Sequence, residues 1–227
     1  MSVPRVKICG VRRPEDALVA AEAGADYIGM VFVPRRRRKV EPTVALEITE
    51  GLRQSSETPP MSVGLFGDQP LNEVLETIEA AGLDCVQLCG DESVDYCRDV
   101  LVHAEIIKVL HVPNDAAPDS IEALGREIDA YSAAGCIVTL DSDVAGLHGG
   151  TGVSFDWSVA AGLAESGRAF MLAGGLTPEN VAVAVDHAKP WGVDVSSGVE
   201  TSGEQDQDKI RNFIANARSG RHPVEKR

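Results

Sequence analysis

The sequence predicts a single-domain α/β protein of the (β/α)8 TIM-barrel class. Short apolar runs rich in β-branched residues alternate with helical patterns along the chain, which is typical of a parallel α/β fold. The length of 227 residues suits one such barrel, and no linker-like stretch divides the chain. Two turns rich in small residues follow the last two predicted strands, where such barrels commonly hold a phosphate.

The eight predicted strands span residues 6–9, 27–32, 62–66, 85–88, 106–110, 136–140, 170–173 and 193–195. Proline or acidic residues in a first turn predict helix starts at Pro14, Pro42, Pro70 and Pro178. Gly24 and Gly82 are predicted to end helices in the left-handed conformation. We expect the barrel to occupy residues 1–218 and a flexible polar tail, without apolar periodicity, to occupy residues 219–227.

Composition indicates a protein of the cytoplasm. Hydrophobic residues make up 44% of the chain, yet no apolar run reaches membrane-spanning length and the N-terminus does not resemble a signal peptide. The five cysteines are an odd number and lie mostly in strand-like runs, which argues against a disulfide framework and for a reducing compartment.

The acidic balance restricts the partners. A net charge of −14 argues against nucleic acid or an anionic membrane, because both require a basic face. An anionic small-molecule substrate would need local positive groups that act against the field of the whole protein.

Strand alternation predicts which side chains face the inside of the barrel. Functional groups gather at the carboxyl ends of barrel strands, and alternate residues of each strand point inward. The polar or thiol-bearing residues that this pattern turns inward are Lys7, Cys9, Gln87, Cys89, Thr139, Asp141, Asp194 and Ser196. This is more polarity than an apolar core requires, so these residues are expected to line a site.

Cys9 and Asp141 are each the last inward residue before a strand opens into a loop. A thiol whose pKa is lowered by a nearby cation can act as a base, and a partly desolvated carboxyl can act as a general acid. The alternatives are that Cys9 is a small buried hydrophobe and that Asp141 caps a helix or turn. Their position in the pattern favours the catalytic interpretation.

Further side chains are candidates for binding or for structure. Residues 35–39 form a run of five cations after the second strand, from which a carboxylate or phosphate could be bound, although most are expected to be solvated. Lys7 and Asp194 lie on adjacent strands of a closed barrel and are expected to form an ion pair. The predicted phosphate turns contain Gly174, Gly175, Ser196, Ser197 and Gly198.

Metal and dinucleotide sites are not supported. The spacing of Cys85, Cys89 and Cys97 differs from that of zinc sites, and the five histidines are scattered. His148 lies in a glycine-rich loop, where contact with solvent is the expected role. A Gly-x-Gly-x-x-Gly motif does not follow the first strand. We therefore expect no metal and no dinucleotide cofactor.

A series of motifs resembles the phosphoribosylanthranilate isomerase family in the right order over nearly the whole chain. These motifs are Val6-Lys7-Ile8-Cys9-Gly10, the strand exit 29–34, Val86-Gln87-Leu88, Leu140-Asp141-Ser142, Gly149-Gly150-Thr151-Gly152, Phe155-Asp156-Trp157, the segment 173–180 and the segment 194–200. The resemblance implies a metal-free and cofactor-free barrel enzyme of tryptophan biosynthesis. Its reaction is an aldose–ketose Amadori rearrangement of N-(5-phosphoribosyl)anthranilate to 1-(2-carboxyphenylamino)-1-deoxyribulose 5-phosphate.

The resemblance also implies roles for individual residues. Cys9 corresponds to the general base and Asp141 to the general acid, while Arg38 corresponds to an arginine that holds the anthranilate carboxylate. The predicted substrate-binding residues are Arg38, Gln87, Gly174, Gly175, Asp194, Ser196, Ser197 and Gly198. Three positions depart from the family pattern: Cys89 replaces a histidine, Arg36 replaces a small residue, and Val153 replaces a lysine.

Two other functions remain open at this stage. One is a related barrel enzyme acting on another sugar phosphate, although the metal-binding histidines of ribulose-phosphate epimerases are missing. The other is a barrel that binds a phosphosugar without turning it over, for which both Cys9 and Asp141 would be unnecessary. The sequence is compatible with a monomer or a homodimer.

Overall fold

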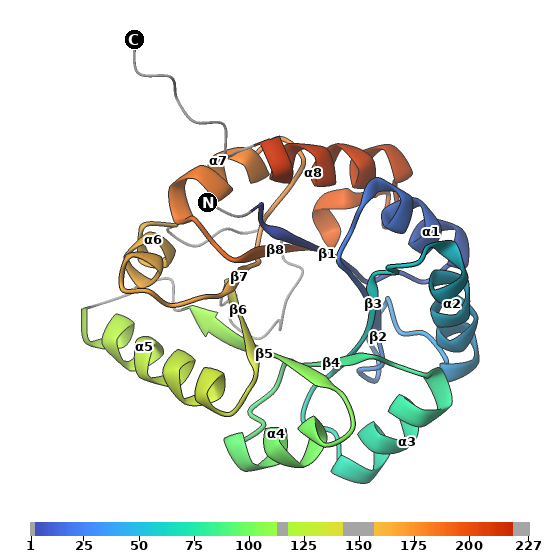
Figure 1. Ribbon diagram of the computed structural model, residues 1–227, viewed down its shortest axis with the longest axis horizontal. Coiled ribbons are helices and arrows are strands. Elements are labelled where there is room, and N and C mark those ends of the chain that lie inside the picture. Colours follow the sequence, from blue (N-terminus) through green and yellow to red (C-terminus); the bar gives the residue numbers. More distant parts are fainter. Residues whose placement is uncertain (1–2, 113–117, 143–156, 220–227) are drawn as a thin grey trace.

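Eight parallel strands close into a barrel in chain order, as the sequence predicts. The structure is a computed structural model that describes residues 3–112, 118–142 and 157–219. The strands are β1 (Arg5–Cys9), β2 (Tyr27–Val31), β3 (Met61–Phe66), β4 (Cys85–Leu88), β5 (Glu105–Val112), β6 (Ile137–Ser142), β7 (Met171–Leu172) and β8 (Gly192–Val195). Pairing of β1 with β8 completes the ring (Figure 1).

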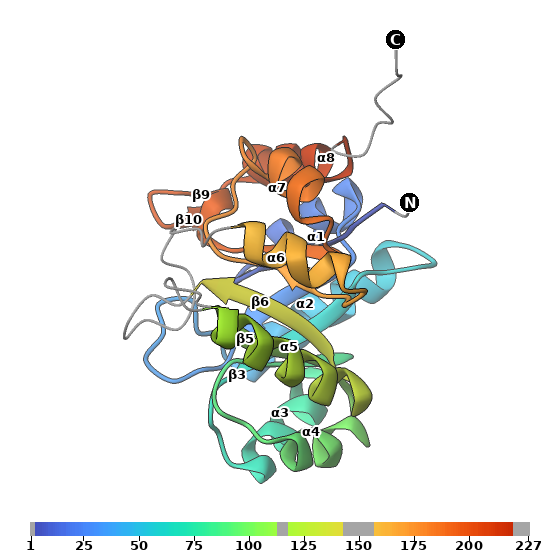
Figure 2. The same ribbon diagram turned by 90° about the vertical axis from the view of Figure 1, so that its left-hand side faces the viewer.

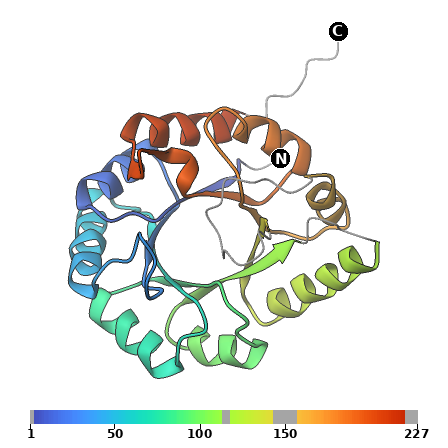
Figure 3. The ribbon, with the colours of Figure 1, turned by 180° about the vertical axis from the view of Figure 1, so that it is seen from behind.

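Helices surround the strands, and α8 returns beside α1 (Figure 3). They are α1 (Pro14–Ala23), α2 (Pro42–Ser55), α3 (Leu71–Ala81), α4 (Val94–Leu101), α5 (Pro118–Ala133), α6 (Trp157–Glu165), α7 (Val181–Ala188) and α8 (Gln207–Ser219). After β8 the chain forms a short 3-10 helix (Ser197–Val199) and the hairpin of β9 (Glu200–Thr201) and β10 (Glu204–Gln205). This hairpin lies at the end of the barrel toward which the arrow of β6 points (Figure 2).

The predicted helix boundaries are mostly confirmed. Pro14 and Pro42 begin their helices, while Pro70 immediately precedes α3. Gly24 and Gly82 end α1 and α3 with φ angles of 93° and 61°, which glycine adopts without a Cβ penalty. The start predicted at Pro178 is wrong by three residues, because Thr177–Asn180 bonding forms a turn and α7 begins only at Val181.

The core has two layers, which follow from strand alternation. Val6, Ile8, Val138 and Leu140 belong to the layer between strands and helices. Cys9 belongs to a smaller apolar cluster inside the barrel, together with Tyr27, Val31, Val63, Leu65, Cys85, Ile107 and Met171. The predicted inward and outward faces of the first and sixth strands are therefore confirmed.

The predicted C-terminal tail can be placed only in part. Ser219 is the last residue of α8, and residues 220–227 of the predicted tail lie outside the described residues. No helix in the described ranges combines the length and apolarity that crossing a bilayer requires.

Candidate active site

A pocket of about 290 Å³ opens at the carboxyl ends of the barrel strands. All ten predicted site residues line it: Cys9, Arg38, Gln87, Asp141, Gly174, Gly175, Asp194, Ser196, Ser197 and Gly198. They come from six of the eight strands or from the loops that follow them, which are distant in sequence and are brought together by barrel closure. The size of the pocket is close to the lower end of the range for small-molecule sites.

Lys7 and Asp194 form the predicted ion pair across the β1–β8 seam, where they are register partners. The Lys7 ammonium donates to both carboxylate oxygens of Asp194, at 3.0 and 3.1 Å, and the Lys7 side chain is fully buried. Burial alone would lower the pKa of Lys7, but the Asp194 carboxylate outweighs it and raises that pKa above its ordinary value. Lys7 is therefore a fixed positive charge beneath the pocket.

Cys9 lies one inward position above Lys7 on β1, and its backbone carbonyl accepts a hydrogen bond from Gln205 Nε2 at 3.0 Å. Burial raises the pKa of the Cys9 thiol, whereas the neighbouring Lys7 ammonium and Arg38 guanidinium act to lower it. A side chain at Gly29 would contact both Lys7 Nζ and the Cys9 Cα, so this glycine leaves room for the cation beside the thiol.

Asp141 lines the pocket near the end of β6 and is the register partner of His111 on β5. His111 also lines the pocket, although the sequence pattern did not point to it. The predicted fifth strand ended at Leu110, whereas β5 continues to Val112. Extending the same alternation by two residues would have placed His111 on the inward face.

The two predicted phosphate turns form one side of the pocket. Gly174 and Gly175 have φ angles of 84° and 65°, which bring bare backbone to the pocket after β7. Asn180 braces this turn, because its Oδ1 accepts the Thr177 N–H at 2.8 Å and its Nδ2 donates to the Gly175 carbonyl at 2.9 Å. A Cβ at Gly198 would overlap the Leu176 carbonyl oxygen, so the β8 turn packs closely against the β7 turn.

Arg38 reaches the pocket from the loop after β2 and is bound by a carboxylate that the sequence did not indicate. Its Nε and Nη2 donate to Glu200 at 2.6 and 3.1 Å, and Arg37 Nη2 donates to the same carboxylate at 2.6 Å. Burial would raise the pKa of Glu200, but hydrogen bonds from the two guanidinium groups dominate and lower it. Glu200 thereby fixes the orientation of Arg38.

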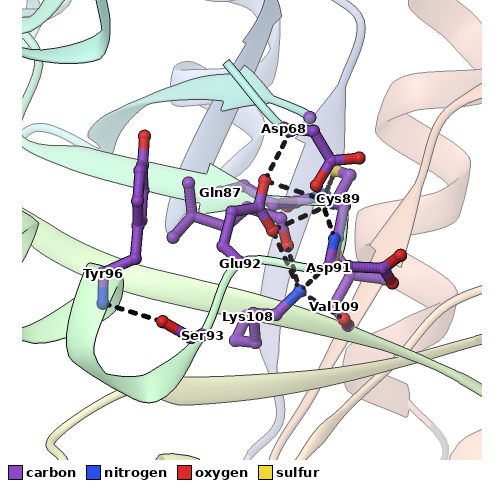
Figure 4. A network of polar contacts seen from close by, with 12 residues as sticks. Asp68, Gln87, Cys89, Asp91, Glu92, Ser93, Tyr96, Lys108 and Val109 are labelled. Atoms are coloured by element: carbon purple, nitrogen blue, oxygen red, sulfur yellow. Dashed lines mark hydrogen bonds and ion pairs between the residues drawn. The ribbon is translucent and has the colours of Figure 1, made fainter. Parts of the chain in front are cut away.

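Gln87 on β4 and Cys89 just after it line the pocket wall, next to a buried network that the sequence did not indicate (Figure 4). Gln87 Nε2 contacts the Cys89 sulfur at 3.5 Å, and burial raises the pKa of Cys89 to about 12. Lys108 donates to Glu92 Oε2 at 3.1 Å, and Glu92 accepts backbone N–H groups from Asp68 and Gly90. The network joins the loops after β3 and β4.

The described residues contain no group of three or more His, Cys, Asp or Glu side chains arranged to hold a metal ion. All five cysteines are free thiols. His148, Val153 and the Gly149-Gly150-Thr151-Gly152 and Phe155-Asp156 parts of the family motifs lie outside the described residues.

Comparisons with known proteins agree with this geometry. The family model for N-(5'-phosphoribosyl)anthranilate isomerase matches residues 6–216. The N-(5'-phosphoribosyl)anthranilate isomerase of Roseiflexus sp. strain RS-1 is 42% identical over 217 residues, covering 94% of this chain and 97% of the relative.

Solved structures extend the similarity to three dimensions. A crystal structure of monomers of the dimeric phosphoribosylanthranilate isomerase from Thermotoga maritima has a TM-score of 0.78 at 35% identity, with 95% of this chain and 99% of that chain covered. A phosphoribosylanthranilate isomerase in complex with reduced 1-(o-carboxyphenylamino)-1-deoxyribulose 5-phosphate also has a TM-score of 0.78, at 33% identity and with the same coverage.

Proposed function

Because the chain belongs to the N-(5'-phosphoribosyl)anthranilate isomerase family and is an enzyme of this type, we propose that Cys9 and Asp141 are its general base and general acid. The family reaction, in tryptophan biosynthesis, converts the ribosylamine N-(5-phosphoribosyl)anthranilate into an amino-ketose phosphate. The observation that carries the assignment is that a thiol and a carboxyl, from β1 and β6, line one pocket with two bare-backbone turns.

The acid acts first in the proposed mechanism. Asp141 donates its proton to the furanose ring oxygen, and the bond between that oxygen and C1 breaks to give a Schiff base. Asp141 suits this role because it lines the pocket as a partly buried residue next to its register partner His111 on β5. Opening the ring makes the C2 proton acidic.

The base acts on the opened sugar. The Cys9 thiolate removes the C2 proton, and the resulting enolamine relaxes to the ketone of the product. A thiolate requires local positive charge when it is buried, and the Lys7 ammonium supplies it from the layer below. Asp194 is thus better explained as the partner of Lys7 than as a direct substrate ligand.

Six of the remaining predicted residues bind the two anionic ends of the substrate. Gly174, Gly175, Ser196, Ser197 and Gly198 offer backbone N–H groups and hydroxyls that suit the phosphate. Arg38, held by Glu200, suits the anthranilate carboxylate through the donors that Glu200 leaves available. Gln87 lines the wall between these ends.

The test follows the fluorescence decay of N-(5-phosphoribosyl)anthranilate in buffer containing EDTA. We expect rapid decay with the parent and a loss of about 10²- to 10⁴-fold in kcat for Cys9→Ala and for Asp141→Asn, the usual range for general acid–base catalysis. Both variants should still bind the reduced product analogue, because neither is proposed to hold an anionic end.

Cys97→Ala is the matched control, since Cys97 lies in the outer core layer on α4 and is expected to keep parental kcat. Parental turnover by Cys9→Ala would exclude Cys9 as the base and direct attention to Cys89. No decay with a folded parent that binds the analogue would indicate a phosphosugar-binding barrel.

Assembly and location form a further part of the proposal. We expect a monomer or a homodimer in the cytoplasm, with no nucleic acid or membrane as partner. The net charge of −14 and the five free thiols support this view. Sedimentation velocity of the full chain would distinguish the two assembly states.

A further inference from the structure

Four consecutive arginines occupy the loop after β2, but they are not equivalent. Arg37 and Arg38 both donate to Glu200, whose side chain is only 8% exposed, and Arg37 also donates to the Gly203 carbonyl. A single carboxylate therefore shares its negative charge between two guanidinium groups. This part of the pocket keeps an excess of positive charge.

Arg36 is half-buried and lines the pocket, yet its guanidinium donates to no acceptor among the described residues. Asp68 also lines the pocket, and its Oδ1 accepts the Asp91 N–H at 2.7 Å. Because the Arg36 guanidinium lines the pocket and has no acceptor among the described residues, it is available to an anionic ligand. Its planar fork of donors matches a carboxylate.

The order of strands indicates which end of the ligand Arg36 meets. The two phosphate turns follow β7 and β8, Cys9 ends β1, and Arg36 follows β2, so the reacting carbon lies between two anion-binding regions. In the substrate of the proposed function, the sugar carbons likewise lie between a phosphate and an aromatic carboxylate. The end remote from the phosphate therefore meets the loop after β2.

We propose that Arg36 is a specificity-determining residue that binds the aromatic carboxylate of the substrate together with Arg38. Arg38 has two of its donor positions occupied by Glu200, whereas Arg36 has its whole fork available. Since the protein carries a net charge of −14, a second cation at this point also offsets the repulsion of a multiply charged anion. The inference rests on the proposed function and adds a residue to it.

The test measures binding of two ligands by calorimetry with the full chain. One ligand is reduced 1-(o-carboxyphenylamino)-1-deoxyribulose 5-phosphate, and the other is the same reduced compound with phenylamino in place of o-carboxyphenylamino. For Arg36→Ala we expect the affinity for the first ligand to fall about tenfold to hundredfold, the range for a hydrogen bond to a charged group. The affinity for the second ligand should change less than about threefold.

Two further variants sharpen the result. Arg36→Lys keeps the charge but not the fork, and should recover part of the lost affinity. Arg35→Ala removes the same charge from the same loop at an exposed residue that does not line the pocket, and should bind both ligands like the parent. In turnover, Arg36→Ala should raise KM with a smaller change in kcat, because binding is lost in the ground state as well.

Three outcomes would overturn the inference. If Arg36→Ala lost the same affinity for both ligands, Arg36 would act on the phosphate or through the overall electrostatic field. If Arg35→Ala lost as much affinity as Arg36→Ala, the effect of Arg36 would be one of net charge alone. Parental affinity of Arg36→Ala for the carboxylate ligand would remove Arg36 from the site while leaving the proposed function intact. A folded parent that binds neither ligand and does not turn over substrate would overturn both.

Discussion

Two buried lysines, each paired with a carboxylate, lie on opposite faces of the barrel wall. Lys7 points into the barrel and donates to both oxygens of Asp194, with the Cys9 thiol as its other neighbour. Lys108 points outward from β5 and donates to Glu92 and to three backbone carbonyls, those of Leu88, Gly90 and Val109.

The surroundings of the two lysines differ more than their burial. Lys108 is 2% exposed and lies 5.8 Å from the Tyr131 ring centroid, within a network that ties the loops after β3 and β4 (Figure 4). Lys7 is equally buried but lies under the pocket floor, where its charge acts to lower the pKa of the Cys9 thiol. A buried ion pair thus joins two loops in one place and sets the electrostatic surroundings of a pocket thiol in the other.

The largest expected effect comes from Lys7→Met. Removing the cation raises the pKa of Cys9, and the thiolate fraction at pH 7 falls about tenfold for each pH unit by which that pKa rises. The acid limb of the profile of kcat/KM against pH should move to higher pH, and activity should recover in part as pH rises. Stopped or continuous assays from about pH 6 to about pH 10 measure this directly.

Lys7→Met also leaves the Asp194 carboxylate buried without its partner, which costs about 3–5 kcal/mol in such pairs. The double variant Lys7→Met/Asp194→Asn removes that orphan charge and is the control for stability. It should regain part of the unfolding free energy while the acid limb stays displaced. An unmoved acid limb in both folded variants would show that Lys7 has only a structural role.

The next effect in size is that of Lys108→Met, which leaves the Glu92 carboxylate buried and unpaired. We expect the unfolding free energy to fall by about 3–5 kcal/mol, which for a chain of this length lowers Tm by roughly 10 °C. The acid limb of kcat/KM should stay within about 0.3 pH units of the parent, because Lys108 lies outside the barrel. Urea unfolding and the same pH profile test both statements.

The double variant Lys108→Met/Glu92→Leu separates loss of the pair from loss of the loop network. It should recover stability relative to Lys108→Met if the orphan charge dominates, since apolar replacements of buried pairs are often tolerated. A displacement of the acid limb as large as in Lys7→Met would remove the distinction between the two lysines.

The inner pair was predictable from the sequence, whereas the outer pair was not. Alternation along β1 and β8 depends only on the two-residue period of a strand, and closure of the barrel makes those strands neighbours. Lys7, Cys9 and Asp194 therefore follow from local rules plus one topological step. Arg38, by contrast, follows only from the resemblance to the isomerase family, and barrel closure brings it into one pocket with the other nine predicted site residues.

The contacts that the sequence did not indicate depend on loop conformations. Glu92 reaches Lys108 only because the turn after β4 folds back over the strand end, and Glu200 reaches Arg38 across 162 positions of sequence. No residue period specifies either path. The omission of His111 has a different cause, since only the predicted length of its strand was wrong.

The smallest effect is expected at the partly exposed pair of Glu200 with Arg37 and Arg38, through Glu200→Gln. Because the folded-state pKa of Glu200 is lowered, its ionised form stabilises the protein above the ordinary carboxyl pKa. That contribution is lost as pH falls through the lowered folded-state value. The difference in unfolding free energy between parent and variant, about 1 kcal/mol or less at pH 7, should therefore shrink toward pH 4.

Thermal unfolding at about pH 7, 5 and 4 measures this difference, with Glu204→Gln as a control. Glu204 pairs with Arg12 at 2.5 Å, but its side chain is 61% exposed, so solvent screens the pair. A difference for Glu200→Gln that grows as pH falls would have the wrong sign for a stabilising ionised carboxylate. The expected effects of breaking the three carboxylate pairs thus follow from what each carboxylate holds in place. Asp194 holds the lysine beside Cys9, Glu92 joins two loops through Lys108, and Glu200 orients Arg38.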